Sequence, residues 1–143
     1  MSPVSDLVGG GHFRLDRGQW TADTSMALCL AESLIGTGFD LCDQLERYLR
    51  WVNEGYFSST GKCFGIGQQT FRALGDFSRT GQILSSYSGS RSACNGSLMR
   101  LAPVPIATYL NLEQTYKISA ASSITTHPNL ECIEVCAAYG TYG

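Results

Sequence analysis

With 143 residues, the chain is long enough for one domain with a hydrophobic core and too short for two. Hydrophobic residues make up 43% of it, which predicts an ordered globular protein. Ten basic and twelve acidic side chains are spread along the chain without a basic stripe, which argues against nucleic acid or an anionic membrane as the main partner. No stretch reaches the roughly 20 apolar residues of a membrane span, and the N-terminus lacks a signal-peptide pattern, so we expect a cytoplasmic protein.

The cysteines leave more than one interpretation open. Their even number permits disulfides, but the missing secretion signal and the apolar helical patterns around several of them favour buried or free thiols. A zinc site is a weaker alternative, because Cys132 and Cys136 form the only close pair. The six residues are Cys29, Cys42, Cys63, Cys94, Cys132 and Cys136.

Apolar spacing predicts helices in the first half of the chain, after an irregular glycine-rich start over residues 1–20. Residues from 24 to about 35 are apolar almost all round, as in a buried helix, and Gly36 with Gly38 would end it. The next helix would be capped by Asp40 and run to the residues before Gly55, with a charged outer face. Residues 55–67 read as a loop. A short helix over 68–77 would follow, using Phe71, Leu74 and Phe77.

The second half also reads as helical. Residues 78–94 are rich in serine and glycine, which fits a flexible linker or a ligand-binding loop. A helix from about Gly96 should be kinked or ended by Pro103 and Pro105. Two further helices are predicted over about 112–125 and 128–139, with Pro128 at the first position of the latter.

We therefore expect a single, partial all-α domain over residues 1–143. The last helix would stop while still apolar and be followed by Gly140-Thr141-Tyr142-Gly143, which suggests a chain cut within its fold. Uncovered helix faces would then favour aggregation or a homo-oligomer.

Oxygen-bearing side chains gather at the start of the first helix. Thr21, Asp23 and Thr24 offer the hydroxyl and carboxylate oxygens that Mg²⁺ prefers. The competing interpretation is an ordinary N-cap by Thr21 or Asp23.

Two later stretches are candidates for ligand binding. Residues 88–97 bring small side chains to a helix start, where backbone amides can approach a diphosphate, although a plain loop capped by Asn95 would look the same. Arg100 fits either a phosphate ligand or a buried ion pair. A lone histidine such as His127 is more often structural than catalytic, and His12 has no visible partner and reads as a surface residue.

These stretches resemble the motifs of the ADP-ribosylglycohydrolase family. Trp20-Thr21-Ala22-Asp23-Thr24-Ser25-Met26 is similar to W-T-D-D-T-x-M, Asn95-Gly96-Ser97-Leu98-Met99-Arg100 is similar to G-N-G-x-x-M-R, and Thr126-His127 matches the family's T-H. The resemblance implies a two-magnesium hydrolase with Thr21 and Asp23 as metal ligands and Asp23 as the catalytic carboxylate. It assigns substrate binding to Ser92, Asn95, Gly96, Ser97 and His127.

The chain also departs from the family pattern. Ala22 stands where the family has an aspartate, by natural divergence or by a deliberate knock-out, and Cys94 replaces the first glycine of G-N-G. The G-D-x-x-G and D-x-D-T segments of the family are absent. The resemblance therefore implies an impaired Mg²⁺-dependent hydrolase that removes ADP-ribose from a modified, arginine-type side chain, with ADP-ribose or an ADP-ribosylated protein as partner. A non-catalytic ADP-ribose-binding module and a helical interaction domain are the alternatives.

Overall fold

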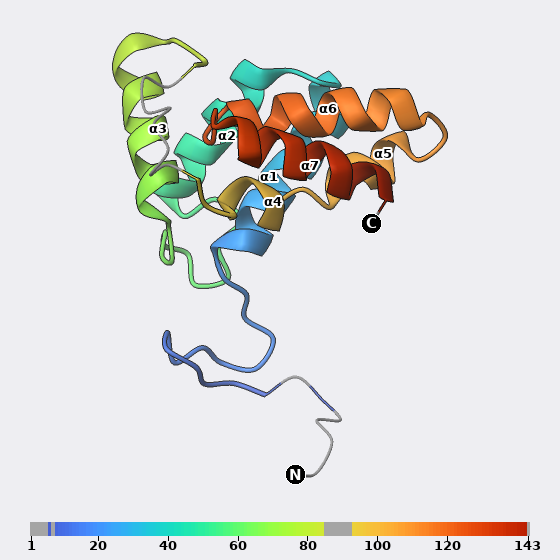
Figure 1. The fold of residues 1–143 in the computed structure, drawn as a ribbon. Coiled ribbons are helices and arrows are strands. Elements are labelled where there is room, and N and C mark those ends of the chain that lie inside the picture. Colours follow the sequence, from blue (N-terminus) through green and yellow to red (C-terminus); the bar gives the residue numbers. More distant parts are fainter. Residues whose placement is uncertain (1–5, 7, 85–92, 143) are drawn as a thin grey trace.

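A computed structural model describes residues 6, 8–84 and 93–142. Within these ranges the chain is all-α, as predicted, and its only β pairing is an isolated bridge between Gly10 and Leu15. Residues 8–20 lead irregularly into the helical body (Figure 1). The helices are α1 (Ala22–Thr37), α2 (Leu41–Glu54), α3 (Gln68–Thr80), α4 (Gly96–Met99), α5 (Pro103–Thr108), α6 (Leu112–Ile124) and α7 (Leu130–Tyr142).

Helix α1 is the wall shared by two hydrophobic clusters. Its N-terminal half packs against α2 and α3, where the buried members are Ala22, Met26, Cys29, Leu45, Tyr48, Trp51, Leu74 and Phe77. Its C-terminal half packs against α5, α6 and α7, where the buried members are Leu30, Leu101, Val104, Ile118 and Cys136. Because α1 serves both clusters, it is apolar almost all round, as the sequence indicated.

Gly38, Asp40 and Gly55 lie at the ends of α1 and α2 as predicted, whereas Gly36 lies inside α1. Asp40 Oδ1 accepts hydrogen bonds from the amides of Cys42 (2.8 Å) and Asp43 (3.2 Å), so it caps α2. Gly38 ends α1 at a φ of 74°. Gly55 ends α2 at a φ of 72°, and a Cβ there would lie 2.2 Å from the carbonyl oxygen of Gly61, so this turn requires glycine.

The prolines divide the next helical stretch as expected. Helix α4 ends at Met99, and Pro103 opens α5, where its missing amide hydrogen costs nothing. Helices α6 and α7 then lie side by side (Figure 1). Asn111 caps α6 through the amide of Gln114, at 3.0 Å.

Two predictions about α7 were wrong. It begins at Leu130 and not at Pro128, because the side chain of Asn129 accepts a hydrogen bond from the amide of Glu131 at 2.9 Å and holds the first turn. It also continues to Tyr142, so Gly140 and Thr141 belong to the helix and not to an irregular tail.

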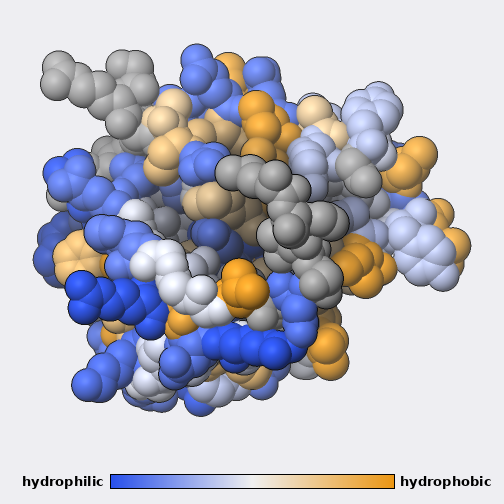
Figure 2. All heavy atoms as spheres, turned by 90° about the horizontal axis from the view of Figure 1, so that it is seen from below, coloured by the Kyte–Doolittle hydropathy of each residue, from blue (hydrophilic) through white to orange (hydrophobic). Residues whose placement is uncertain are grey.

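The surface of the described residues carries dispersed apolar side chains. Phe71 was predicted to face inward, yet its side chain is 58% exposed, whereas Ala73, Leu74 and Phe77 are buried. Figure 2 shows hydrophobic residues as separate groups among hydrophilic ones on the face it presents. None of the described helices is long and apolar enough to cross a membrane.

Candidate ligand site at the start of α1

Thr21 and Asp23 lie side by side where α1 begins. Thr21 occupies the N-cap position, but its side chain makes no capping bond. Its hydroxyl instead lies 3.4 Å from Asp23 Oδ2, and its carbonyl oxygen accepts bonds from the amide and the hydroxyl of Ser25, both at 3.2 Å. The prediction that the Thr21 side chain caps α1 is therefore wrong. The Thr21 hydroxyl and the Asp23 carboxylate instead place two oxygen atoms next to each other.

This pair offers two oxygen atoms of the kind that Mg²⁺ prefers. An ion could bind both oxygens, since they lie within the span of neighbouring ligands, with water completing the shell. Ala22 adds no oxygen, and it is 8% exposed within the α1–α2–α3 cluster. Among the described residues, no three His, Cys, Asp or Glu side chains lie close enough to hold a metal.

A cavity of about 370 Å³ joins the three predicted motifs. Asp23 comes from α1, Asn95 and Gly96 from the start of α4, and His127 from the segment that follows α6. Ala22, Met26, Cys94 and Met99 also line the cavity, and the rest of its wall is formed by the loop before α3 and the first residues of that helix. The members from this wall are Gly65, Ile66, Gly67, Gln68, Gln69, Thr70 and Arg72.

His127 is held by partners on both ring nitrogens. Nδ1 lies 2.8 Å from Thr126 Oγ1, and Nε2 lies 2.9 Å from Cys94 Sγ. Burial, with a smaller contribution from the charge of Arg100, lowers the pKa of His127 to about 4. The imidazole is therefore neutral at pH 7, with one nitrogen donating a hydrogen bond and the other accepting one.

Gly96 allows this histidine to approach the backbone of α4. A Cβ at Gly96 would lie 2.9 Å from Cε1 and 3.0 Å from Nε2 of His127, so a larger residue would displace the ring. The neighbouring Asn95 is exposed and takes the N-cap position of α4 without a side-chain capping bond. The capping role considered for Asn95 is therefore wrong, and its carboxamide lines the cavity.

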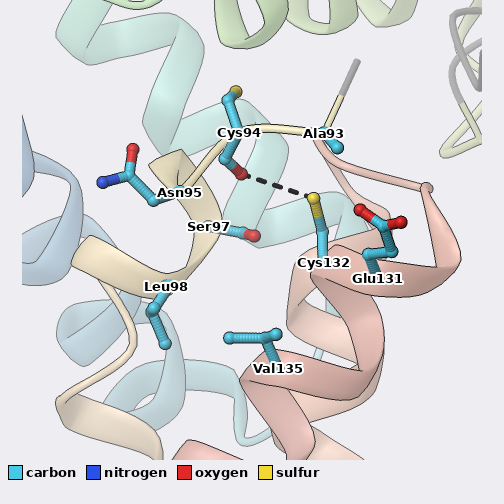
Figure 3. Close-up of a pocket in the computed structure, with 8 residues that line it drawn as sticks. All are labelled: Ala93, Cys94, Asn95, Ser97, Leu98, Glu131, Cys132 and Val135. Atoms are coloured by element: carbon cyan, nitrogen blue, oxygen red, sulfur yellow. Dashed lines mark hydrogen bonds between the residues drawn. The ribbon is translucent and has the colours of Figure 1, made fainter. Parts of the chain in front are cut away.

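Ser97 has a different setting from its neighbours. It is buried, and its Oγ accepts hydrogen bonds from Ser123 Oγ (2.9 Å) and from Cys136 Sγ (3.4 Å). It lines a second hollow of about 260 Å³ between α4 and α7, shown in Figure 3. Ser92, the remaining predicted ligand residue, lies outside the described residues.

Arg100 takes neither of the roles considered for it. It is fully buried, and its Nη2 donates to the carbonyl oxygen of Ser122 (3.2 Å) and to Thr125 Oγ1 (3.0 Å). Its guanidinium carbon lies 4.6 Å from the ring centroid of Tyr48. Arg100 thus ties the end of α4 to α2 and α6, and it is not among the residues that line the cavity.

Sequence reasoning missed two features of the site. The segment Gly65-Ile66-Gly67-Gln68-Gln69-Thr70 lines the cavity, although it was read only as a loop and a helix start. Its signal was the same run of small residues before a helix that drew attention to residues 88–97. The second feature is the contact between Cys94 and His127, which are 33 positions apart. All six cysteines are free thiols, in agreement with the favoured interpretation. His12 is exposed, as predicted.

The described helices bring Asp23, Asn95, Gly96 and His127 together at one cavity of an all-α domain. Residues 1–142 match the ADP-ribosylglycohydrolase family, and the chain belongs to it. It is 41% identical over 138 residues to the ADP-ribosylarginine hydrolase Tri1 of Serratia proteamaculans, covering 96% of this chain and 38% of that protein. It is 32% identical over 103 residues to the ADP-ribosyl-[dinitrogen reductase] glycohydrolase of Rhodospirillum rubrum, covering 71% of this chain and 32% of that one.

A solved structure supports the same assignment. The chain superposes on an ADP-ribosylglycohydrolase-related protein complex with a TM-score of 0.77 at 38% identity, over 98% of this chain and 44% of the other. The predicted fold and family are thereby confirmed. The chain spans less than half the length of these relatives.

Proposed function

We propose that this chain binds ADP-ribose in the cavity between α1, α3, α4 and His127, as the ligand-binding part of an ADP-ribosyl-acceptor hydrolase. The observation that carries the proposal is the meeting of Asp23, Asn95-Gly96 and His127 in one cavity, although they come from three separate segments. A cavity of about 370 Å³ is within the range of small-molecule sites. The name of the Serratia relative supports arginine as the acceptor to which the ADP-ribose is attached.

The cavity offers distinct groups to distinct parts of such a ligand. Gly67 would expose backbone to a diphosphate, because nothing lies within 4 Å of its missing side chain, and Gly65 and Gly96 line the same cavity. His127, neutral and fixed by Thr126, can pack against a ribose or hydrogen-bond to its hydroxyls. Asn95 adds an exposed carboxamide at the entrance. We assign Ser97 to the support of α4, and its direct contact with ligand stays a prediction.

The same geometry favours binding over cleavage. Thr21 and Asp23 would hold one Mg²⁺, which when bound would polarise ribose oxygens. Among the described residues that line the cavity, Asp23 is the only carboxylate, so it would have to serve both as metal ligand and as base for water. Hydrolysis of glycosidic bonds ordinarily relies on two groups that divide these tasks. We therefore propose slow or absent hydrolysis by this chain alone.

Calorimetric titration with ADP-ribose tests the proposal, once with Mg²⁺ and once with a chelator. Saturable binding that weakens on chelation supports a shared site for ligand and metal at Thr21 and Asp23. Binding that is equal in both buffers supports a metal-independent ADP-ribose module. A folded sample that gives no heat in either buffer refutes the proposal and leaves a helical interaction domain. Release of ADP-ribose from a modified arginine peptide, followed by chromatography, measures hydrolysis directly.

A further inference from the structure

Of the six thiols, only two are open to a reagent. Cys29, Cys132 and Cys136 are buried and Cys63 is half-buried, whereas Cys42 and Cys94 are exposed. Burial raises the pKa of the Cys29 thiol to about 12 and also raises the pKa values of Cys63 and Cys132, which keeps these groups protonated. A reagent that modifies thiols should therefore react first with Cys42 or Cys94.

Cys94 differs from Cys42 in having a base beside its sulfur. Its Sγ lies 2.9 Å from Nε2 of His127, and Nδ1 of the same ring is held by Thr126. Figure 3 shows the thiol of Cys94 pointing away from Cys132, whose own Sγ approaches the Cys94 carbonyl oxygen at 3.3 Å. The neighbour of the Cys94 sulfur is thus an imidazole and not another thiol. No hydrogen bond or base is described for the Cys42 sulfur, which lies at the start of α2.

Cys94 also stands where an adduct would matter. It lines both the cavity of Asp23 and His127 and the hollow between α4 and α7. A group added to its sulfur would extend beside Asn95 and Gly96, into space that the proposed ligand needs.

We infer that Cys94 is a base-assisted nucleophilic thiol, that soft carbon electrophiles modify it in preference to the other cysteines, and that the adduct closes the cavity. With iodoacetamide, Sγ forms a bond to the methylene carbon as the carbon–iodine bond breaks and iodide leaves. The thiol proton passes to Nε2 of His127 and from there to water. Because burial disfavours a standing imidazolium, the proton moves as the carbon–sulfur bond forms, in the manner of general-base catalysis.

Competition between the two exposed thiols within one molecule tests this inference. The folded chain is treated with limiting iodoacetamide at pH 7, and the modified peptides are counted over time by mass spectrometry. We expect Cys94 to react about tenfold faster than Cys42, since a positioned base accelerates proton transfer by at least that factor. Rates that are equal, or faster at Cys42, overturn the inference.

Two variants assign the effect to the imidazole. In His127→Gln, shown by circular dichroism to be folded, the ratio of the two rates should fall to about one while the Cys42 rate stays unchanged. If that variant does not fold, Thr126→Val replaces it, because losing the Nδ1 partner should lower the ratio in the same direction. An unchanged ratio in a folded variant overturns the role of His127.

The blocking effect rests on the proposed function and is measured separately. Cys42→Ser leaves Cys94 as the exposed thiol, and ADP-ribose is titrated before and after alkylation. Binding before and none after supports closure of the cavity, and equal binding in both refutes it. If the unmodified Cys42→Ser protein fails to bind, the proposed function fails, while the labelling ratio still decides the reactivity of Cys94.

Discussion

Gly96 and His127 are in direct van der Waals contact, and the contact leaves no room for a side chain on the glycine. A Cβ would lie 2.9 Å from Cε1 of a ring that is fully buried and bonded on both nitrogens, so the ring cannot simply swing aside. The absence of a side chain at Gly96 thus makes room for the His127 ring.

Gly96→Ala should therefore weaken ADP-ribose binding and lower the free energy of unfolding by about 1–3 kcal/mol, the usual cost of overpacking. Urea denaturation and calorimetric titration check the two effects. Gly75→Ala is the matched control, because Gly75 lies within α3 with nothing within 4 Å of its missing Cβ. This variant should raise the free energy of unfolding by about 0.5–1 kcal/mol. If the two variants have the same free energy of unfolding and bind ADP-ribose equally well, the contact with His127 does not exclude a side chain at position 96.

A second close approach joins α6 to α7. A Cβ on Gly140 would lie 2.1 Å from Ser119 Oγ and 2.9 Å from Ser119 Cβ. Gly140→Ala should force these helices apart and lower the free energy of unfolding by about 1–3 kcal/mol or more. Thermal unfolding followed by circular dichroism measures the loss, and a variant as stable as the wild type would contradict the helical placement of Gly140.

Ala22→Asp should make folding stability depend on magnesium. A second carboxylate beside Asp23 supplies the missing oxygen ligand, but at a position only 8% exposed it costs stability until a cation compensates it. The melting temperature should fall without Mg²⁺ and rise with increasing Mg²⁺, as binding to the folded state requires. Thr24→Asp, an exposed change in the same helical turn, is the control. The same response to Mg²⁺ in both variants would refute a metal site at Ala22.

His127 should make the protein less stable in mild acid. Its pKa is lowered to about 4 in the folded state, against 6.5 in the unfolded chain, so the unfolded state binds more protons between these values. The contribution of neutral His127 to the free energy of unfolding is complete above pH 6.5. It falls by up to about 1.4 kcal/mol per pH unit as the pH is lowered toward 4. Urea denaturation across this range should show a smaller slope in His127→Gln. An equal slope in His127→Gln and the wild type would contradict this prediction.

The sequence predicted the helices well because their signals are local. Apolar spacing marks the bodies of α1 and α2. Gly38 and Gly55 mark their C-terminal ends through a positive φ, and Asp40 marks the start of α2 through its capping bonds. The errors arose where two neighbouring residues compete for one role. Asn129 caps α7, which begins at Leu130 and not at Pro128, and Ala73 rather than Phe71 faces inward on α3.

The site was only partly predictable for a different reason. Thr21, Asp23, Asn95 and His127 carry polar groups in recognisable order, whereas Gly65 and Gly67 contribute backbone and space, which leave little trace in a single sequence. The contact of Cys94 with His127 depends on how α4 sits against the end of α6, and spacing along the chain does not encode that arrangement.

The double use of α1 ties the site to the integrity of the whole molecule. In the part of the chain that the structure describes, α1 is the one helix that both hydrophobic clusters share. Separating α1 from either cluster therefore exposes apolar surface on the helix that carries Asp23. Amide hydrogens in the middle of α1 should consequently exchange only when the entire domain opens, and the oxygen donors at its first turn should lose their arrangement in that same event.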